Sequence, residues 1–312
     1  YWRDWSSHVC SSDLVPAAQA SIPVGDAGFV LGTTVTEQLR TFNGRLFKPA
    51  EHAARFARSL SMVGTVAPDS IEAIFAAADT VASRSHAALA AHRGGDLGVI
   101  VLATPGDLPA QHEGRPGTPR VVIHAFPLAF ASWAAAYDEG VALRSVDVAQ
   151  VPGDCWPLAL KCRSRMHYHL ADSAARAAEP GARALVCHVD GRVSETSTAN
   201  VAIVRGDTLL TPPPGDALPG VSLAHLRSLA RAEGLEWREA SLAAADVAAA
   251  DEVLLTSTPN CVLPAVRFDG RAIGSGRPGP VFARLLAAWS RGVGLDIAAQ
   301  ARACAARHAP SA

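Results

Sequence analysis

One dipeptide, Asn43-Gly44, constrains the fold of this chain more than any other local feature. It lies in the segment TVTEQLRTFNGRLFKP, where apolar and polar residues alternate on both sides of it. Asn-Gly favours the tight turns that join antiparallel strands, because both residues tolerate positive φ angles. The sequence therefore predicts a β-hairpin over residues 34–49.

Two helices and two strands are expected to complete a first domain with this hairpin. Glu51 begins an amphipathic segment, and residues 70–92 form a second one with the same helical spacing of apolar residues. Apolar, β-branched runs bounded by Gly and Pro predict strands at residues 97–106 and 119–129. Strands mixed with helices predict a compact α/β domain that ends near residue 128.

The second half of the chain is denser in strand-type sequence. Apolar, β-branched segments predict strands or hairpins at residues 140–146, 182–195, 199–213 and 252–273. Asp-Gly and Gly-Asp pairs inside these segments supply turns. Amphipathic helices are expected to interrupt them at residues 164–179 and 222–234.

The length of 312 residues fits two domains, and we expect the following boundaries. Residues 1–14, YWRDWSSHVCSSDL, resemble translated adapter DNA and are excluded as a non-native segment. The predicted parts are a small α/β domain at 15–128, a connection at 129–140, a second domain at 141–295 and a tail at 296–312.

Composition excludes several classes of partner. The formal net charge is −1, which gives no basic surface for nucleic acid. Hydrophobic residues make up 49% and charged residues 18%, yet no apolar run is long enough for a membrane helix. The six cysteines lack C-x-x-C spacing, so we interpret them as reduced thiols of a cytoplasmic protein.

Lysine is rare in this chain. Of 28 Lys and Arg residues only Lys48 and Lys161 are lysines, a bias typical of GC-rich codon usage, so a retained lysine is informative. Lys161 follows the apolar segment WPLAL, expected to be a strand, and precedes a helix. Burial there would lower its pKa toward the nucleophilic range, and a guanidinium forms no stable Schiff base. The alternative is a half-buried lysine that extends to solvent, and Lys48 shows that a lysine persists without a special role.

A carboxylate and an anion-binding pattern follow Lys161 along the chain. Glu195 stands after a predicted hairpin among hydroxyl residues, where it could pair with a protonated ring nitrogen or be a solvated edge-strand acid. Pro219-Gly220 precedes a helix capped by Ser222, and free N–H groups at a helix start suit a phosphate. Most helix starts bind nothing, so this pattern alone is weak.

Two further groups could bind a phosphate. Thr256, Ser257 and Thr258 form a hydroxyl cluster at the end of an apolar strand. Arg55, on a helix face opposite the apolar residues, is a candidate bidentate clamp. Taken alone, each of these is equally consistent with an ordinary loop or surface position.

Together and in this order, the arginine, the lysine, the glutamate, the L-P-G-V-S motif and the T-S-T motif resemble the class IV aminotransferase family. These are fold-type IV pyridoxal-phosphate enzymes, including branched-chain aminotransferases, D-amino acid transaminases and aminodeoxychorismate lyase. DAGFVLGTTVTEQLRTFNGRLFKPAEHAARFARS matches the first family signature, and VSETSTANVAIV with LLTPPPGDALPGVS matches the central one. The resemblance runs from about residue 22 to about residue 290.

The resemblance implies an α+β, two-domain fold with a small N-terminal α/β domain and a larger, β-barrel-like C-terminal domain with helices. It implies that Lys161 forms a Schiff base with pyridoxal 5′-phosphate and moves protons, and that Glu195 keeps the pyridine nitrogen protonated. Leu218 would pack on the ring. The residues implied to hold the phosphate are Arg55, Val221, Ser222, Thr258 and Ser257.

The chain departs from the family at several positions near the implied substrate. The tyrosine usually found five residues after the lysine is Met166 here, and Tyr168 is the candidate substitute. Thr36 stands where many members have an aromatic residue. Arg163 and Arg165 are candidates for binding a substrate carboxylate, with a surface turn as the alternative. The family's first strand pair is expected to be missing, since residues 1–14 are excluded.

The implied function is transamination of a small amino acid, by default a branched-chain or other apolar L-amino acid, with a 2-oxo acid acceptor. The alternatives are an aminodeoxychorismate lyase-type enzyme and an inactive cofactor-binding homologue or truncated fragment. The resemblance also implies a homodimer whose sites borrow a loop from the neighbouring subunit. No metal site is expected, because His167 and His169 face different sides of a helix.

Overall fold

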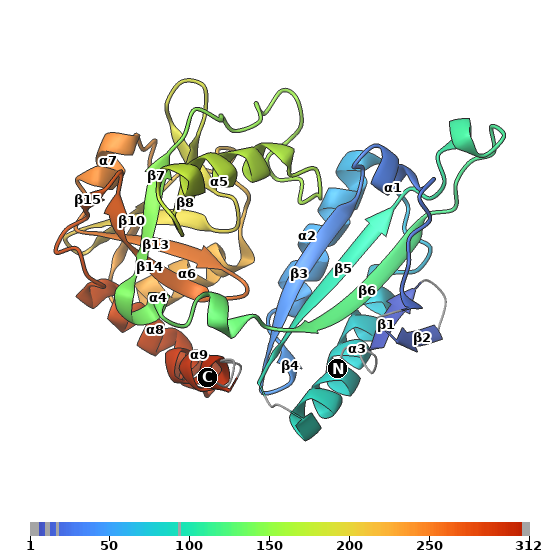
Figure 1. Cartoon of the computed structure of the whole chain (residues 1–312), viewed down its shortest axis with the longest axis horizontal. Helices are drawn as coiled ribbons and strands as arrows, with labels where there is room; N and C mark the ends of the chain where they lie inside the picture. Colours follow the sequence, from blue (N-terminus) through green and yellow to red (C-terminus); the bar gives the residue numbers. More distant parts are fainter. Residues whose placement is uncertain (1–5, 10–12, 17–18, 93–94, 308–312) are drawn as a thin grey trace. The chain divides into compact units, whose positions relative to one another are not determined.

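The structure is a computed structural model that describes residues 6–9, 13–16, 19–92 and 95–307 (Figure 1). The chain divides into two compact units. Unit 1 comprises Tyr1–Leu128 and Leu160–Ser164, and unit 2 comprises Ala129–Ala159 and Arg165–Ala312. The short segment Leu160–Ser164 therefore belongs to unit 1, although the chain on both sides of it belongs to unit 2.

Unit 1 is built on one antiparallel sheet with the strand order β2-β1-β6-β5-β3-β4. Its strands are β1 (Ser6–Val9), β2 (Asp13–Pro16), β3 (Val35–Phe42), β4 (Arg45–Leu46), β5 (Leu97–Thr104) and β6 (Arg120–Pro127). Its α-helices are α1 (Ala27–Val30), α2 (Pro49–Val63) and α3 (Ile71–His92).

The predicted hairpin is confirmed. Phe42 pairs with Arg45 across the turn, and Asn43 and Gly44 have φ angles of 49° and 76°. Both turn residues thus occupy the left-handed region that this tight turn requires. A Cβ on Gly44 would lie 2.5 Å from Cδ2 of His86, so the close approach of α3 also requires glycine.

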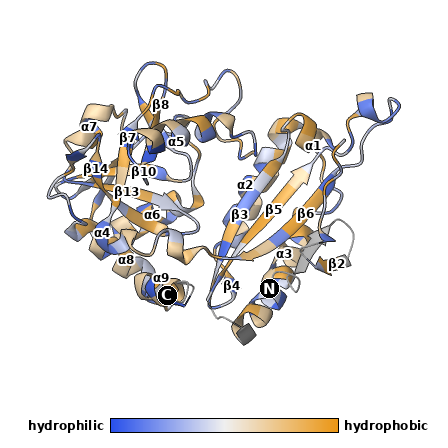
Figure 2. Cartoon of the chain, viewed as in Figure 1, coloured by the Kyte–Doolittle hydropathy of each residue, from blue (hydrophilic) through white to orange (hydrophobic). Residues whose placement is uncertain are grey.

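The core of unit 1 lies between the sheet and helices α2 and α3. Leu39 of β3, Phe56 of α2, Val81 of α3 and Val99 of β5 are all fully buried in it. Figure 2 shows the apolar residues concentrated along β5, as expected for a strand that has strands on both sides and helices against one face. Burial of such side chains is the main stabilising contribution, about 1.5–3 kcal/mol each.

The N-terminal strands correct one prediction. We excluded residues 1–14 and expected the first strand pair to be missing, yet β1 and β2 pair with each other and β1 extends the sheet at β6. An edge strand such as β6 presents unpaired N–H and C=O groups, and pairing with β1 satisfies them. The rest of the excluded segment, residues 1–5 and 10–12, lies outside the described residues.

Unit 2 is built on a second, larger sheet. Its strands are β7 (Val141–Ser145), β8 (Arg183–Cys187), β9 (Val193–Thr196), β10 (Asn200–Arg205), β11 (Thr208–Thr211), β12 (Glu236–Glu239), β13 (Glu252–Ser257), β14 (Cys261–Phe268) and β15 (Arg271–Ala272). Its α-helices are α4 (Ala136–Glu139), α5 (Met166–Ala178), α6 (Val221–Ala232), α7 (Ala244–Ala248), α8 (Pro280–Val293) and α9 (Ile297–Ala306).

Six of these strands close into a barrel, and the predicted α+β, barrel-like architecture is confirmed. The ring runs β10-β13-β14-β7-β8-β9 and closes through the Asn200–Glu195 pair of β10 and β9. Leu143, Leu185, Val201 and Leu255 lie in its core and are essentially inaccessible. Closure leaves β9 and β10 side by side, which matters for the site described below.

One local prediction was wrong, and two predicted segments contain helices. The segment 156–160, expected to be a strand, forms turns, because its backbone does not pair with either sheet. The expected connection at 129–140 contains the short helix α4. The expected tail at 296–312 contains α9, which buries Ile297, Ala301 and Cys304 at helical spacing. That spacing was readable in the sequence, but alanine at the other positions weakened it.

Helix α8 begins with a cap from a distant strand. Glu252 of β13 is mostly buried and accepts hydrogen bonds from the N–H groups of Val281 and Phe282, both at 2.8 Å. A carboxylate at this position satisfies two otherwise unpaired donors and interacts favourably with the helix dipole. No helix within the described residues is long and apolar enough to cross a membrane.

Candidate active site

The predicted site residues are divided between the two units, and each group is described by itself. Arg55, Thr36, Lys161 and Arg163 belong to unit 1. The remainder belong to unit 2 and comprise Arg165, Tyr168, Glu195, Leu218, Val221, Ser222, Ser257 and Thr258.

Unit 1 holds a buried ionic cluster that contains Arg55. The Arg55 guanidinium donates to both carboxylate oxygens of Glu37 on β3, at 2.7 and 2.8 Å, and Nδ1 of His52 lies 2.7 Å from the same carboxylate. Burial alone would raise the pKa of Glu37, but the hydrogen bonds and charge of Arg55, assisted by His52, lower it from 4.5 to about 2. The fork expected to grip a phosphate thus engages a carboxylate.

His52 belongs to the same cluster and is fully buried. Burial lowers its pKa and outweighs the opposing effect of Glu37, and the charges of Arg55 and Lys161 lower it further. His52 is therefore neutral at neutral pH, and Arg55 is the cation that balances Glu37. The effect of Lys161 on His52 also indicates that the lysine's charge is close to this cluster.

Lys161 lies on a short extended segment that runs along β3. Its carbonyl accepts from Thr36 N–H at 3.0 Å, its own N–H donates to Ser59 Oγ at 3.2 Å, and Cys162 forms an antiparallel bridge with Val35. The lysine is half-buried. Its backbone is thus fixed by β3 on one side and α2 on the other, rather than by the strand predicted before it.

The two other predicted residues of unit 1, Thr36 and Arg163, each contact the backbone of a neighbouring segment. The hydroxyl of Thr36 is buried and donates to Val101 O at 3.2 Å across the sheet. Arg163 continues the pairing with the β3 region, since its N–H donates to Thr34 O at 2.9 Å, and its side chain is exposed. These contacts explain how the Lys161 segment is anchored, and they give Thr36 a structural role.

In unit 2, Glu195 is surrounded by hydrogen-bond donors. It lies on β9 with 7% of its surface exposed. Its carboxylate accepts from Tyr168 Oη at 2.7 Å, Asn200 Nδ2 at 3.1 Å and Leu218 N at 3.4 Å. An ionised carboxylate has about four acceptor positions, so this set of donors suits the charged form.

Tyr168 is brought to Glu195 by the first turn of α5. Burial raises the pKa of Tyr168, and the adjacent Glu195 charge raises it further, so the phenol stays protonated and donates. The Arg165 guanidinium lies over its ring at 4.8 Å and donates to Ser197 O. Tyr168 therefore uses its single proton on Glu195, and its candidate role as the substitute for the tyrosine missing at Met166 stays a prediction.

Asn200 links these residues and was not singled out from the sequence. Its amide donates to Glu195 and, at 2.8 Å, to the carbonyl of Leu218. A Cβ on Gly220 would lie only 2.0 Å from Asn200 Oδ1, so the turn before α6 packs directly on this amide. Its position as the first residue of β10, two residues after the Ser197-Thr198 pair, was the available signal.

The N-terminus of α6 carries the strongest sign of an anion site. Its N-cap is Gly220, which has no side-chain capping hydrogen bond, and Val221 and Ser222 are its first residues. Ser222 is 3% exposed, and its hydroxyl has no hydrogen-bond partner in the described structure. A buried, unpartnered hydroxyl beside uncapped N–H groups is unfavourable unless a ligand pairs with it.

The hydroxyl cluster of Thr256, Ser257 and Thr258 lies at the end of β13, next to β10. Thr256 pairs with Asn200 across the two strands, which brings Ser257 and Thr258 to the strand end beside this amide. Ser257 is buried and donates to Asn260 Oδ1 at 2.8 Å, whereas Thr258 is half-buried. Unit 2 thus gathers Glu195, the α6 N-terminus and this strand end around Asn200.

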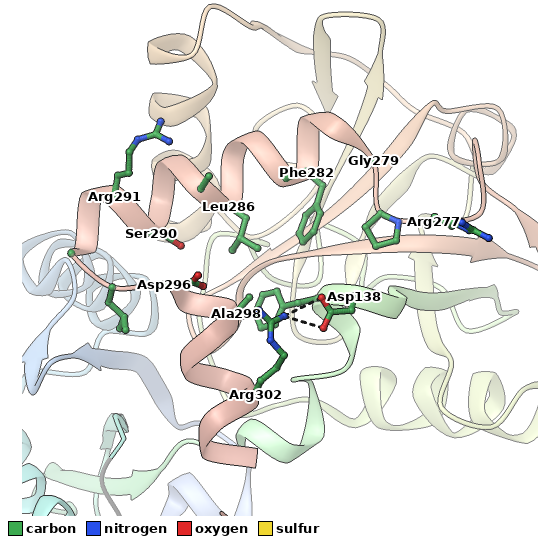
Figure 3. Close-up of a pocket in the computed structure, with 16 residues that line it drawn as sticks. Asp138, Arg277, Gly279, Phe282, Leu286, Ser290, Arg291, Asp296, Ala298 and Arg302 are labelled. Carbon is green, nitrogen blue, oxygen red and sulfur yellow. Dashed lines mark hydrogen bonds and ion pairs between the residues drawn. The ribbon is translucent and has the colours of Figure 1, made fainter. Parts of the chain in front are cut away.

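A separate hollow of about 870 Å³ lies in unit 2 and contains none of the predicted site residues. It is lined mainly by α8 and α9, with Phe282 and Leu286 on one side and the Asp138–Arg302 ion pair at its edge (Figure 3). No group of His, Cys, Asp or Glu that could hold a metal ion occurs among the described residues.

Comparison with known proteins identifies the family to which this chain belongs. A family model described as amino-transferase class IV matches residues 34–268. A D-alanine aminotransferase from Bacillus licheniformis is 28% identical over 272 residues, which cover 86% of this chain and 90% of that protein. A branched-chain-amino-acid aminotransferase-like protein 2 from Arabidopsis thaliana is 29% identical and covers 89% of this chain, which spans about half (49%) of that longer protein.

Solved structures share the fold. The branched-chain amino acid aminotransferase of Escherichia coli has a TM-score of 0.82 at 24% identity, covering 93% of this chain and 94% of that one. The enzyme from Thermobaculum terrenum, solved in its PLP-form, has a TM-score of 0.78 at 20% identity, covering 94% and 95%.

Proposed function

Because this chain belongs to the class IV aminotransferases, we propose that it is a pyridoxal 5′-phosphate-dependent enzyme that transfers the amino group of a small amino acid to a 2-oxo acid. The observation that carries this proposal is the buried, unpartnered hydroxyl of Ser222 at the uncapped start of α6. A phosphate would supply the acceptors that this hydroxyl and the adjacent N–H groups lack.

The residues present fit the cofactor. Ser222 and the N–H of Val221 would bind its phosphate together with Thr258 and Ser257. Glu195, already held by neutral donors, would hold the proton at its pyridine nitrogen. The carbonyl and N–H of Leu218 are fixed by Asn200 and Glu195, which would set the Leu218 side chain against the ring.

Arg55 and Lys161 are the proposed contributions of unit 1. Arg55, whose guanidinium donates to Glu37 at 2.7 and 2.8 Å, is the proposed ligand of the phosphate from this unit. Lys161 would bind the cofactor aldehyde covalently, and its Nζ would move the proton from the Cα of the substrate. When bound, pyridoxal phosphate accepts the amino group and withdraws electrons from that Cα.

For the substrate we propose an apolar, branched-chain L-amino acid. This proposal rests on the structural neighbours, several of which are branched-chain aminotransferases. The main alternative amino donor is D-alanine, because D-alanine aminotransferases are among the sequence relatives. Arg163 and Arg165 remain the candidate carboxylate ligands.

We further propose a cytoplasmic homodimer. Unit 1 exposes a run of apolar side chains around α1, with Val24, Phe29 and Leu31 exposed by 82%, 72% and 59%. Several large apolar side chains exposed within one short segment are characteristic of protein interfaces. None of the five described cysteines forms a disulfide, as expected in a reducing compartment. The mass in solution, measured by light scattering, tests the dimer.

The experiment that tests the function starts with the purified protein and added pyridoxal phosphate. We expect a visible absorbance band, its loss in Lys161→Ala and its retention in Lys48→Ala, because Lys48 is paired with Glu51 on the surface. Branched-chain L-amino acids should then yield product only when a 2-oxo acid is added. A protein that never gains the band would refute the proposal, and turnover without a 2-oxo acid would indicate a lyase instead.

A further inference from the structure

Unit 2 contains a chain of hydrogen bonds that ends on Glu195 and whose direction is fixed. Gln150, in the loop after β7, is 2% exposed. The N–H of Val151 donates to its Oε1 at 2.9 Å, which assigns Oε1 as the carbonyl oxygen and Nε2 as the amide nitrogen. The Nε2 amide has two protons, and one points to Tyr168 Oη at 3.0 Å, the other to Ser194 Oγ at 2.9 Å.

The hydroxyl protons of Tyr168 and Ser194 can then be arranged in only one way. Tyr168 has a single proton, and because its oxygen accepts from Gln150, that proton goes to Glu195 at 2.7 Å. Ser194 likewise accepts from Gln150 and donates to Asp216 O at 2.6 Å. Every donor in this series of hydrogen bonds thus has an acceptor. The protons on the path from Gln150 through Tyr168 all point toward Glu195.

We propose that Gln150 and Tyr168 form a one-way hydrogen-bond relay that fixes the Glu195 carboxylate in its ionised, acceptor-only state and in one orientation. Tyr168 is then a positioning residue for the contact between Glu195 and the pyridine nitrogen. This role rests on the proposed function. It also accounts for the departure at Met166: the tyrosine of this chain, two residues further along, acts on the glutamate.

The burial of the relay determines which effect dominates when it is broken. Loss of the Tyr168 proton would make Glu195 more basic, which by itself favours a bond to a ring N–H. However, Glu195 is 7% exposed and Gln150 is 2% exposed, so water does not readily replace the lost donor. The carboxylate would keep fewer fixed donors and the Gln150 amide would lose its acceptor, and both changes are costly in a buried site.

The test is the variant Tyr168→Phe, which keeps the ring packed near Arg165 and removes only the hydroxyl. We expect the dissociation constant of pyridoxal phosphate, titrated into cofactor-free protein, to rise about tenfold, the effect of one hydrogen bond to a charged group. Turnover should fall by a similar factor while the KM for the amino donor stays nearly unchanged, because the relay does not touch the substrate.

Two further variants separate positioning from general damage. Gln150→Met removes the donor to Tyr168 but leaves the Tyr168 proton on Glu195, so its effect should be smaller than that of Tyr168→Phe. Thr211→Val removes a buried hydroxyl that donates to Val201 O at 2.9 Å in the same sheet, and should leave cofactor affinity unchanged. A thermal unfolding midpoint for each variant shows how much of any loss comes from stability.

The outcomes are distinguishable. A graded loss of affinity, largest in Tyr168→Phe and absent in Thr211→Val, supports the relay. Wild-type affinity and turnover in Tyr168→Phe overturn it while leaving the proposed function intact, and so does an equal loss in Thr211→Val. A wild-type protein that binds no pyridoxal phosphate overturns the proposed function and, with it, this role of Tyr168.

Discussion

The variant Glu37→Gln tests the energetics of the buried cluster in unit 1. The substitution keeps the shape of the side chain and removes the charge that balances Arg55, which is 4% exposed. The pKa of Glu37 is lowered from 4.5 to about 2, and each unit corresponds to about 1.4 kcal/mol. Ionised Glu37 therefore stabilises the folded state by about 3 kcal/mol at neutral pH, in line with about 3–5 kcal/mol for breaking a buried ion pair.

The sign of the pH dependence follows from the lowered pKa. The contribution of Glu37 is fully present above its ordinary pKa of 4.5 and is lost as the pH falls toward about 2, where the folded protein also takes up the proton. The difference in unfolding free energy between wild type and Glu37→Gln should be largest near pH 7 and should shrink between pH 4.5 and pH 2.

The assay is urea denaturation of cofactor-free protein followed by far-UV circular dichroism, which reports on both units. The matched control is Glu51→Gln in the first turn of α2, where Glu51 forms an ion pair with Lys48 at 2.7 Å on the surface. Exposed pairs contribute about 0–1 kcal/mol, so this variant should be nearly as stable as wild type. Equal losses in the two variants, or a Glu37→Gln loss that does not change with pH, would refute the argument.

Two other substitutions test contacts around the site and the barrel. Gly220→Ala would place a Cβ 2.0 Å from Asn200 Oδ1, so we expect the turn before α6 to be displaced. Pyridoxal phosphate should then bind about tenfold more weakly in an absorbance titration. Unchanged affinity would contradict the tight packing. Glu252→Ala removes the acceptor of the Val281 and Phe282 N–H groups, so the unfolding free energy should fall by about 2–4 kcal/mol in urea. A loss below about 0.5 kcal/mol, the size typical of ordinary surface substitutions, would show that water replaces this cap.

Local sequence signals predicted the elements whose conformation is decided locally. The hairpin at Asn43-Gly44 followed from two residues that accept positive φ, and both have it. The barrel strands followed from β-branched runs between Gly-containing turns. The strand expected before Lys161 was wrong because apolar composition does not reveal whether a pairing edge is available, and the chain there turns instead.

Candidate site residues stood out in the sequence only where a residue type restricts the chemistry. Glu195 and Ser222 stood out by type and by motif, and unit 2 gathers them around Asn200. Gln150 did not stand out, because a glutamine in a loop has no local signature and its function depends on Tyr168 and Ser194, which are distant in sequence. Arg55 was singled out as a phosphate ligand, which stays a prediction, and its bidentate carboxylate partner, Glu37, lies on another element and was not singled out.

The segment Leu160–Ser164 has a consequence for biosynthesis. It completes unit 1 by pairing with residues 34–36, yet it is translated after the rest of that unit. At roughly 5–20 residues per second, the ribosome needs about 2–7 s to proceed from residue 128 to residue 164. During that interval the nascent first unit has an unpaired backbone edge at Val35, and it acquires Lys161 only after the chain has begun the second unit.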